Sequence, residues 1–97
     1  MENIQDSGKH KLKNKDMKKV FEYVDLIARF HALVMSQTTG TPESCARKLS
    51  ISRSSLYNLI AEITSYGIDI EYSREHQTFR YTHPELVEVL ISIRQRA

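Results

Sequence analysis

Residues 41–81 read TPESCARKLSISRSSLYNLIAEITSYGIDIEYSREHQTFRY, and this stretch decides the fold. It contains, in order, a short helical pattern, a tight turn, a second helical pattern and two short alternating segments separated by a polar loop. The order predicts a mainly α fold with a small β component. We expect a helix pair over 41–66 and a β-hairpin over 68–82.

The helix boundaries in this stretch follow from local chemistry. Thr41 supplies a capping hydroxyl in front of Pro42, which suits the first turn of a helix. Ile51 turns the chain and is expected to fill the angle between the two helices. Ser52 is expected to cap the second helix, and Gly67 to end it in the left-handed conformation.

The second helix has two faces of different character at about 100 degrees per residue. Its apolar arc is predicted to face the core and consists of Leu56, Leu59, Ile60 and Ile63. Its opposite face is small and polar and consists of Ser54, Asn58, Ala61 and Ser65, flanked by Tyr57, Ser55 and Glu62. A helix that enters a DNA major groove has such a face, whereas an ordinary solvent face carries paired Lys and Glu residues.

The hairpin is predicted from alternation with a period of two residues. Ile70 and Tyr72 should face Tyr81 and Phe79 across the strands, which requires a loop with an even number of residues. Residues 74–77 provide such a loop, and four-residue loops are commonly built on a type I turn.

Three hairpin side chains are candidates for contacts with a phosphate or the minor groove. Arg74 and Gln77 lie in the loop, and Arg80 is expected on the outward face. Acidic residues at positions 69, 71 and 75 weaken the positive potential of this region, so solvated side chains are an equal alternative.

The segments TPESCARKLSISRSSLYNLIAEI and YGIDIEYSREHQTFRYT resemble the winged helix-turn-helix DNA-binding domains found in many bacterial transcription regulators. In that family, residues matching Ala46, Ile51 and Leu56 hold the two helices together, and Ser52 matches the capping residue. The family often has glycine where this chain has Ser50. The resemblance implies a three-helix core with a two-stranded wing and a C-terminal helix.

The resemblance also implies which residues contact DNA. Together with the hairpin candidates, the predicted DNA-binding set is Ser52, Arg53, Ser54, Ser55, Tyr57, Asn58, Arg74, Gln77 and Arg80. The second helix of the pair is expected in the major groove, with the hairpin beside it.

Two further helices are predicted, over 17–36 and 84–95. In the first, a helical-period stripe consists of Val20, Phe21, Val24, Ile27, Ala28, His31 and Val34, and it is widened by Tyr23, Leu26, Phe30 and Leu33. In the second, the stripe consists of Leu86, Val87, Leu90, Ile91 and Ile93. Both stripes exceed the needs of one small core. The C-terminal stripe can return to the helix over 17–36 and complete the core, or it can pair with its copy in a second subunit, and the prediction is a share of both, with a homodimer through these two helices. His31 is interpreted as a histidine at the edge of the core.

The N-terminal residues 1–16 are predicted to form a flexible basic arm. Six of the fourteen basic residues fall between residues 9 and 19, although the net charge is only +2. The arm is a candidate for phosphate contacts, and a solvated leader is the alternative. The remaining residues, 17–97, are expected to form one domain, because 97 residues accommodate a single small core.

Composition excludes several classes of protein. No apolar run is long enough to span a bilayer, and the N-terminus lacks a secretory signal, so a cytoplasmic location is expected. Cys45 is the single cysteine, is expected to be a buried apolar residue, and has no metal-ligand spacing with the four histidines. No phosphate-binding loop or catalytic constellation is found. We therefore expect no enzyme activity, metal or cofactor.

The sequence predicts sequence-specific binding to double-stranded DNA, with regulation of transcription as its consequence. The alternative is a protein-interaction adaptor built on the same fold, because winged helices also occur in adaptors.

Overall fold

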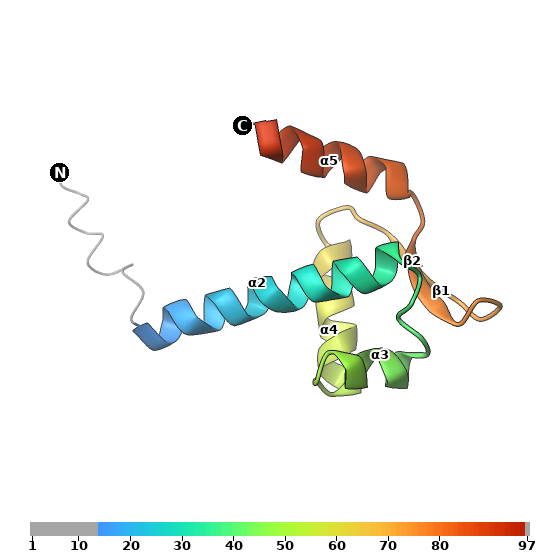
Figure 1. Ribbon diagram of the computed structural model, residues 1–97, viewed down its shortest axis with the longest axis horizontal. Helices are drawn as coiled ribbons and strands as arrows, with labels where there is room; N and C mark the ends of the chain where they lie inside the picture. Colours follow the sequence, from blue (N-terminus) through green and yellow to red (C-terminus); the bar gives the residue numbers. More distant parts are fainter. Residues whose placement is uncertain (1–13, 97) are drawn as a thin grey trace.

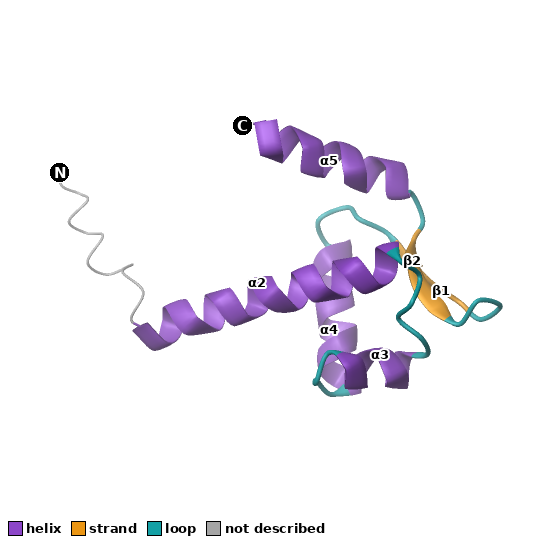
Figure 2. Cartoon of the chain, in the orientation of Figure 1, coloured by secondary structure: helices purple, strands orange, loops and turns teal. Residues whose placement is uncertain are grey.

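The computed structural model describes residues 14–96, which form four helices and a two-stranded antiparallel sheet (Figures 1 and 2). The elements in chain order are α2 (Asn14–Met35), α3 (Pro42–Lys48), α4 (Arg53–Thr64), β1 (Ile70–Ser73), β2 (Thr78–Tyr81) and α5 (Pro84–Arg96). The predicted α+β class, mainly helical with one hairpin, is confirmed.

The predicted caps of α3 and α4 are present. The Thr41 hydroxyl accepts a hydrogen bond from the Ser44 amide at 3.2 Å, with Pro42 in the first turn of α3. The Ser52 hydroxyl accepts from the Ser55 amide at 3.0 Å. Each hydroxyl satisfies one of the amides that a helix start leaves without a partner, so both boundaries are set by local sequence.

The turn between α3 and α4 places Ser50 in the left-handed region at φ 59°. Glycine adopts this conformation at lower cost than serine does. The amide of Ile51 donates to the Ala46 carbonyl at 3.0 Å, which closes the turn. Gly67 has φ 92° and follows the last turn after α4, as predicted. The predicted end of the helix at residue 66 is wrong by two residues, because α4 ends at Thr64 and a tighter turn follows.

The hairpin has the predicted register. Ile70 pairs with Tyr81 and Tyr72 with Phe79, so residues 74–77 form the loop. The strands themselves cover 70–73 and 78–81, a shorter span than the predicted 68–82. Period-two alternation defines the register because a shift by one residue would turn every apolar side chain outward.

The core lies where α2, α3, α4 and β2 meet. Phe30 and Leu56 are completely buried, and the Phe30 ring meets that of Phe79 edge to face with centroids 6.3 Å apart. The predicted inner arc of α4 is confirmed, since Leu59 is also buried and Ile60 and Ile63 are half-buried against the same cluster. Cys45 is buried too, as predicted.

The predicted stripe of the first helix is only partly correct. Phe30 and Val34 of α2 enter the core, with Leu26, Ile27 and Leu33 packed against it. Four members of the predicted stripe are instead exposed, namely Val20 at 44%, Phe21 at 63%, Val24 at 55%, and Ala28. The side chains treated as a widening of the stripe therefore form much of the core face. Both faces of α2 are apolar, so periodicity alone could not distinguish them.

The ends of the terminal helices also differ from the prediction. Helix α2 begins at Asn14, with Asp16 in its first turn near the positive end of the helix dipole, so the predicted arm overlaps the helix by three residues. The rest of the predicted arm lies outside the described residues. Helix α5 extends to Arg96, one residue beyond the prediction. Its Val87 is buried, whereas Leu86 is 55% exposed, and the other predicted stripe side chains, at 90, 91 and 93, are outside the described ones.

A buried threonine pair ties the segment after α2 to the hairpin. The Thr39 and Thr78 hydroxyls lie 3.1 Å apart, and both residues are completely inaccessible. The Thr39 hydroxyl also accepts from the Phe79 amide at 2.8 Å. These contacts satisfy polar groups inside the core and fix the approach to α3 relative to β2.

Candidate nucleic-acid interface

The outward face of α4 is uncovered along the length of the helix. The residues predicted on this face and at its flanks are all exposed: Ser54, Ser55, Tyr57, Asn58, Ala61, Glu62 and Ser65. Their exposure follows from the burial of Leu56 and Leu59 on the other side. Glu62 is the one charged member of this surface, which we call the α4 polar face.

The hydroxyls at the start of α4 have defined hydrogen-bonding roles. The Ser52 hydroxyl caps the helix and also donates to the Ser55 hydroxyl at 3.0 Å. Ser52 is thus occupied as a cap. The Ser55 oxygen acts as an acceptor in that contact, so its own proton is available to an external acceptor.

Asn58 lies one turn further along the α4 polar face. Its amide makes no hydrogen bond with any other group between residues 14 and 96, and the residue is exposed. An amide group presents both donors and an acceptor, which is the combination that reads an adenine edge in the major groove. Tyr57 beside it is 44% exposed and adds a hydroxyl and an aromatic ring.

The start of α4 has a positive electrostatic character. Arg53 is exposed in the first turn, which contains no acidic residue. The positive end of the helix dipole adds to the arginine charge there. A phosphate group approaching this end therefore meets a favourable field.

The hairpin loop has an internal frame that sequence analysis did not predict. The Ser73 hydroxyl accepts from the His76 amide at 3.1 Å, and it lies 3.2 Å from the His76 Nδ1. Gln77 closes the loop in the left-handed region at φ 51°. Serine hydroxyls at the start of a turn commonly accept hydrogen bonds from the backbone of that turn. The serine at position 73, directly before the loop, could therefore have predicted this frame.

The three hairpin candidates differ in their availability. Arg74 and Gln77 are exposed in the loop. Arg80 lies on the outward face as predicted, but its Nε donates to Glu71 Oε2 at 2.9 Å on the neighbouring strand. The Glu71 carboxylate offsets the charge of Arg80, so the Arg80 guanidinium is less available to an external group than that of Arg74.

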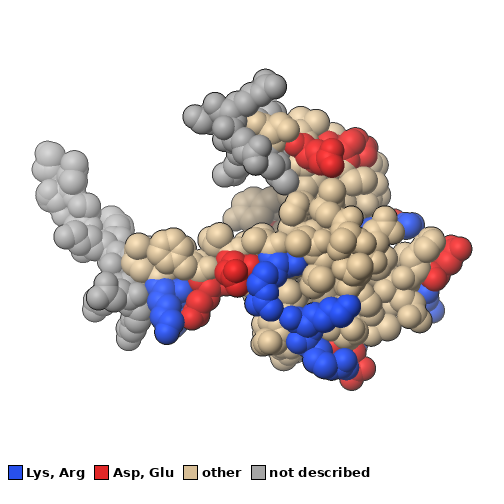
Figure 3. All heavy atoms as spheres, in the orientation of Figure 1, with Lys and Arg blue, Asp and Glu red and all other residues tan. Residues whose placement is uncertain are grey.

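A basic cluster on α2 and α3 was missed by sequence analysis. Arg29 Nη2 donates to the Lys48 carbonyl at 3.1 Å, and Lys48 Nζ donates to the Thr38 carbonyl at 2.6 Å. Arg47, which precedes Lys48 in the chain, is exposed as well. Figure 3 shows Lys and Arg side chains gathered on the face where α2 and α3 lie. The cluster brings together residues 19 positions apart, so no local pattern identifies it.

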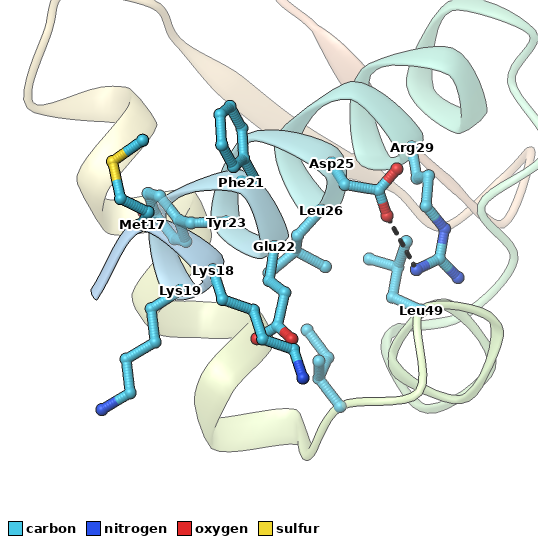
Figure 4. A pocket seen from close by; sticks show the side chains of 11 residues that line it. Met17, Lys18, Lys19, Phe21, Glu22, Tyr23, Asp25, Leu26, Arg29 and Leu49 are labelled. Carbon is cyan, nitrogen blue, oxygen red and sulfur yellow. Dashed lines mark ion pairs between the residues drawn. The ribbon is translucent and has the colours of Figure 1, made fainter. Parts of the chain in front are cut away.

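An open groove of about 890 Å³ runs between the N-terminal half of α2 and the turn before α4 (Figure 4). Lys18, Lys19 and Glu22 line one side, and Leu49 and Ile51 lie opposite. Oppositely charged groups share its rim, and it lacks the enclosed shape and convergent polar groups of a small-molecule site. We assign no ligand to it.

Two titratable side chains are held neutral by burial. Desolvation raises the pKa of the Cys45 thiol to about 11 and outweighs the charge of Lys48, which acts in the opposite direction. Desolvation likewise raises the pKa of Tyr81 to about 12. The Tyr81 hydroxyl lies 2.6 Å from Nδ1 of the half-buried His31, which confirms that this histidine sits at the core edge. A thiol held protonated is a poor nucleophile and metal ligand.

Within the part of the chain that the structure describes, no three His, Cys, Asp or Glu side chains are grouped to hold a metal ion. No helix among these residues is long and apolar enough to cross a membrane. No protein-family model matches the sequence, and comparisons with characterised proteins and with solved structures give no match either. The resemblance to winged helices stays a prediction based on the chain's own residues.

Proposed function

We propose that this protein binds double-stranded DNA in a sequence-specific manner through the α4 polar face, as a winged helix-turn-helix that regulates transcription. The observation that carries the proposal is the composition of this exposed face. It combines short side chains, which permit close approach of the helix backbone, with the hydrogen-bonding groups of Asn58, Ser54 and Ser55.

The surrounding charges support the same orientation. Arg53 stands at the N-terminal end of α4, and recognition helices place this end nearest the base edges. Arg74 and Gln77 extend from the hairpin loop, which provides a second element for backbone contacts. Glu62 lies in the last turns of α4, away from the end expected to enter the groove.

The alternative is a protein-interaction adaptor, and one observation favours it. Apolar side chains of α2 and α5 are exposed, including Phe21 at 63% and Leu86 at 55%. These lie on other elements than the α4 polar face, so the two roles use separate surfaces and are separable by mutation.

Salt dependence tests whether phosphate contacts drive binding. Arg53→Gln and Arg74→Gln should each reduce the slope of log affinity against log salt by about 1, because each removes one phosphate contact. Arg80→Gln is the comparison variant, since its guanidinium is already paired with Glu71, and its effect should be smaller. Fluorescence anisotropy with a DNA duplex measures all three. An absence of DNA binding at low salt would reject the proposal in favour of the adaptor.

Selection of bound fragments from random duplexes tests sequence specificity and supplies the preferred site. Asn58→Ala should then weaken binding to that site by about 1–3 kcal/mol and leave binding to unrelated DNA nearly unchanged. Thr64→Ala, at the other end of α4, is the matched control. Equal losses on both DNAs would remove Asn58 from base recognition.

A further inference from the structure

The outward side of α2 carries an apolar stripe with heptad spacing. Met17, Phe21, Val24 and Ala28 follow one another at steps of four, three and four residues. All four are exposed, Met17 at 40% and Phe21 at 63%. Such alternation of three- and four-residue steps is the pattern by which one helix packs along another. We call these four residues the α2 outer stripe.

Among the side chains that the structure describes, those of the stripe are exposed, and Met17 and Phe21 also border the open groove beside α2. The core takes the opposite side of α2, through Leu26 and Phe30, and β2 of the hairpin meets α2 through the contacts of Phe79 with Phe30 and of Tyr81 with His31. In Figure 4 the Phe21 ring stands on the other side of α2 from Glu22, which points toward the turn before α4. The stripe therefore forms an apolar surface about three turns long that requires a partner.

The charges beside the stripe indicate what that partner is. One flank carries Lys18 and Asp25, both exposed, and the other carries Val20 and the partly buried Ile27. A partner that meets this surface must offer an acid opposite Lys18, a base opposite Asp25, and apolar side chains on the remaining flank. A second α2 that runs in the opposite direction offers all of these.

We propose that two copies of this chain associate through their α2 outer stripes in antiparallel orientation. The stripe then forms four layers, in which Met17 meets Ala28 of the partner subunit and Phe21 meets Val24 of the partner subunit, each twice by symmetry. On one flank Lys18 pairs with Asp25 of the partner subunit, and on the other Val20 packs on Ile27 of the partner subunit. The two-fold axis crosses α2 between Glu22 and Tyr23.

Other arrangements fit the same residues less well. Moving the antiparallel register by one heptad places Asp25 opposite Asp25 of the partner subunit, where like charges repel. It also requires His31 to enter the interface, although His31 already contacts the Tyr81 hydroxyl. A parallel pair places Val20 beside Asp25 of the partner subunit, which sets an apolar side chain against a carboxylate. Asp25 has an existing partner in Arg29, but that contact is long at 3.7 Å and exposed, so it does not prevent the exchange.

Helix α5 lies on the side of α2 away from α3 in Figure 1, and it exposes Leu86 at 55% and Val89 at 52%. These side chains border a small pocket that Gly67 and Ile68 also line, so they are not part of the α2 outer stripe. The self-association does not rest on DNA binding. If both proposals hold, the dimer axis requires a DNA site with two-fold symmetry.

A charge exchange tests both the partner and the orientation. Lys18→Glu and Asp25→Lys each turn two attractive contacts into repulsive ones, and each should raise the dimer dissociation constant roughly 5- to 30-fold. The double variant Lys18→Glu with Asp25→Lys restores both pairs and should return the constant to within about twofold of the parent chain. Sedimentation velocity over a range of concentrations measures the constants, and circular dichroism checks that each variant is folded.

Phe21→Ser is the second test, because it removes the largest side chain of the stripe without touching the core. It should raise the dissociation constant at least roughly 30-fold. Glu88→Gln, an exposed change on α5, should leave it unchanged. A parent chain that remains monomeric at high concentration overturns the proposal. If the double charge variant does not regain the dissociation constant of the parent chain, the antiparallel register is overturned. DNA binding is measured separately on each variant, so a failure of the dimer proposal is distinguished from a failure of the proposed function.

Discussion

The α4 polar face and the α2 outer stripe are both exposed sides of helices that also carry a buried side. They differ in chemistry: Ser54, Ser55 and Asn58 populate the first, whereas Met17, Phe21 and Val24 populate the second. When a polar face binds a polar ligand, hydrogen bonds to water are replaced by hydrogen bonds to the ligand, so the net free-energy change is small. When an apolar stripe is covered, apolar surface is removed from water, which is favourable. The comparison teaches that exposure alone does not identify a function, whereas the composition of an exposed face indicates the kind of partner.

The two sides of α2 allow the sharpest test of this comparison. Phe30→Ala empties a completely buried site and should reduce the free energy of unfolding by about 3–5 kcal/mol. Phe21→Ala, nine positions earlier on the exposed side, should change it by less than about 0.5 kcal/mol at concentrations where the chain is monomeric. Urea unfolding followed by circular dichroism measures both. Similar losses for the two variants would show that the outer stripe is part of the core.

The two sides of α4 provide the second test. Leu56→Ala should cost about 2–5 kcal/mol of stability, because Leu56 is completely inaccessible and anchors α4 against the core. Asn58→Ala, on the α4 polar face, should leave stability within about 0.5 kcal/mol of the parent. Thermal and urea unfolding report the difference. An unchanged melting temperature for Leu56→Ala would contradict its place in the core.

The buried threonine pair joins the segment between α2 and α3 to β2, inside the core that lies behind both exposed faces. Thr39→Val should destabilise the fold by about 1–3 kcal/mol, because it leaves the buried Phe79 amide without its acceptor. Thr82→Val, at an exposed position after β2, is the matched control and should have little effect. Hydrogen exchange should show faster loss of protection at the Phe79 amide in Thr39→Val. Equal stability of the two variants would remove the pair from the core's hydrogen-bonding network.

The last prediction concerns alkaline pH, which acts on groups buried in the core and not on either exposed face. Burial raises the pKa of Cys45 from 9.0 to about 11 and that of Tyr81 from 10.0 to about 12. Both groups are neutral when protonated. Their contribution to stability is therefore complete below the pKa values of the unfolded chain, and it is lost as the pH rises through the raised pKa values of the folded chain. The free energy of unfolding should therefore fall between pH 9 and 12.

Urea unfolding at a series of pH values measures this decline, and Cys45→Ala should remove its lower part. Reaction of the thiol with a disulfide reagent at pH 8 should be slow in the folded chain and fast in urea. Flat stability across this range would contradict the burial of both groups.

Much of the fold was predictable because its signals are local. The capping hydroxyls of Thr41 and Ser52, the left-handed Gly67 and the alternation that sets the hairpin register each act within a few residues. The exposure of the candidate DNA-binding residues on α4 followed from the same helical geometry. Sequence also placed Arg80 outward, but its pairing with Glu71 depends on the side-chain conformations of two strands.

The sequence by itself determined the order of the elements, the capped starts of α3 and α4, the hairpin pairing and the composition of each helix face. Only the tertiary structure decided which of the two apolar faces of α2 enters the core, because Phe30 is selected by the position of Phe79 on a distant strand. It also brought Thr39 to Thr78 and Arg29 to Lys48. The physical reason is that helical and strand periodicity report how polar a face is, whereas the choice between two apolar faces depends on packing between segments far apart in the chain.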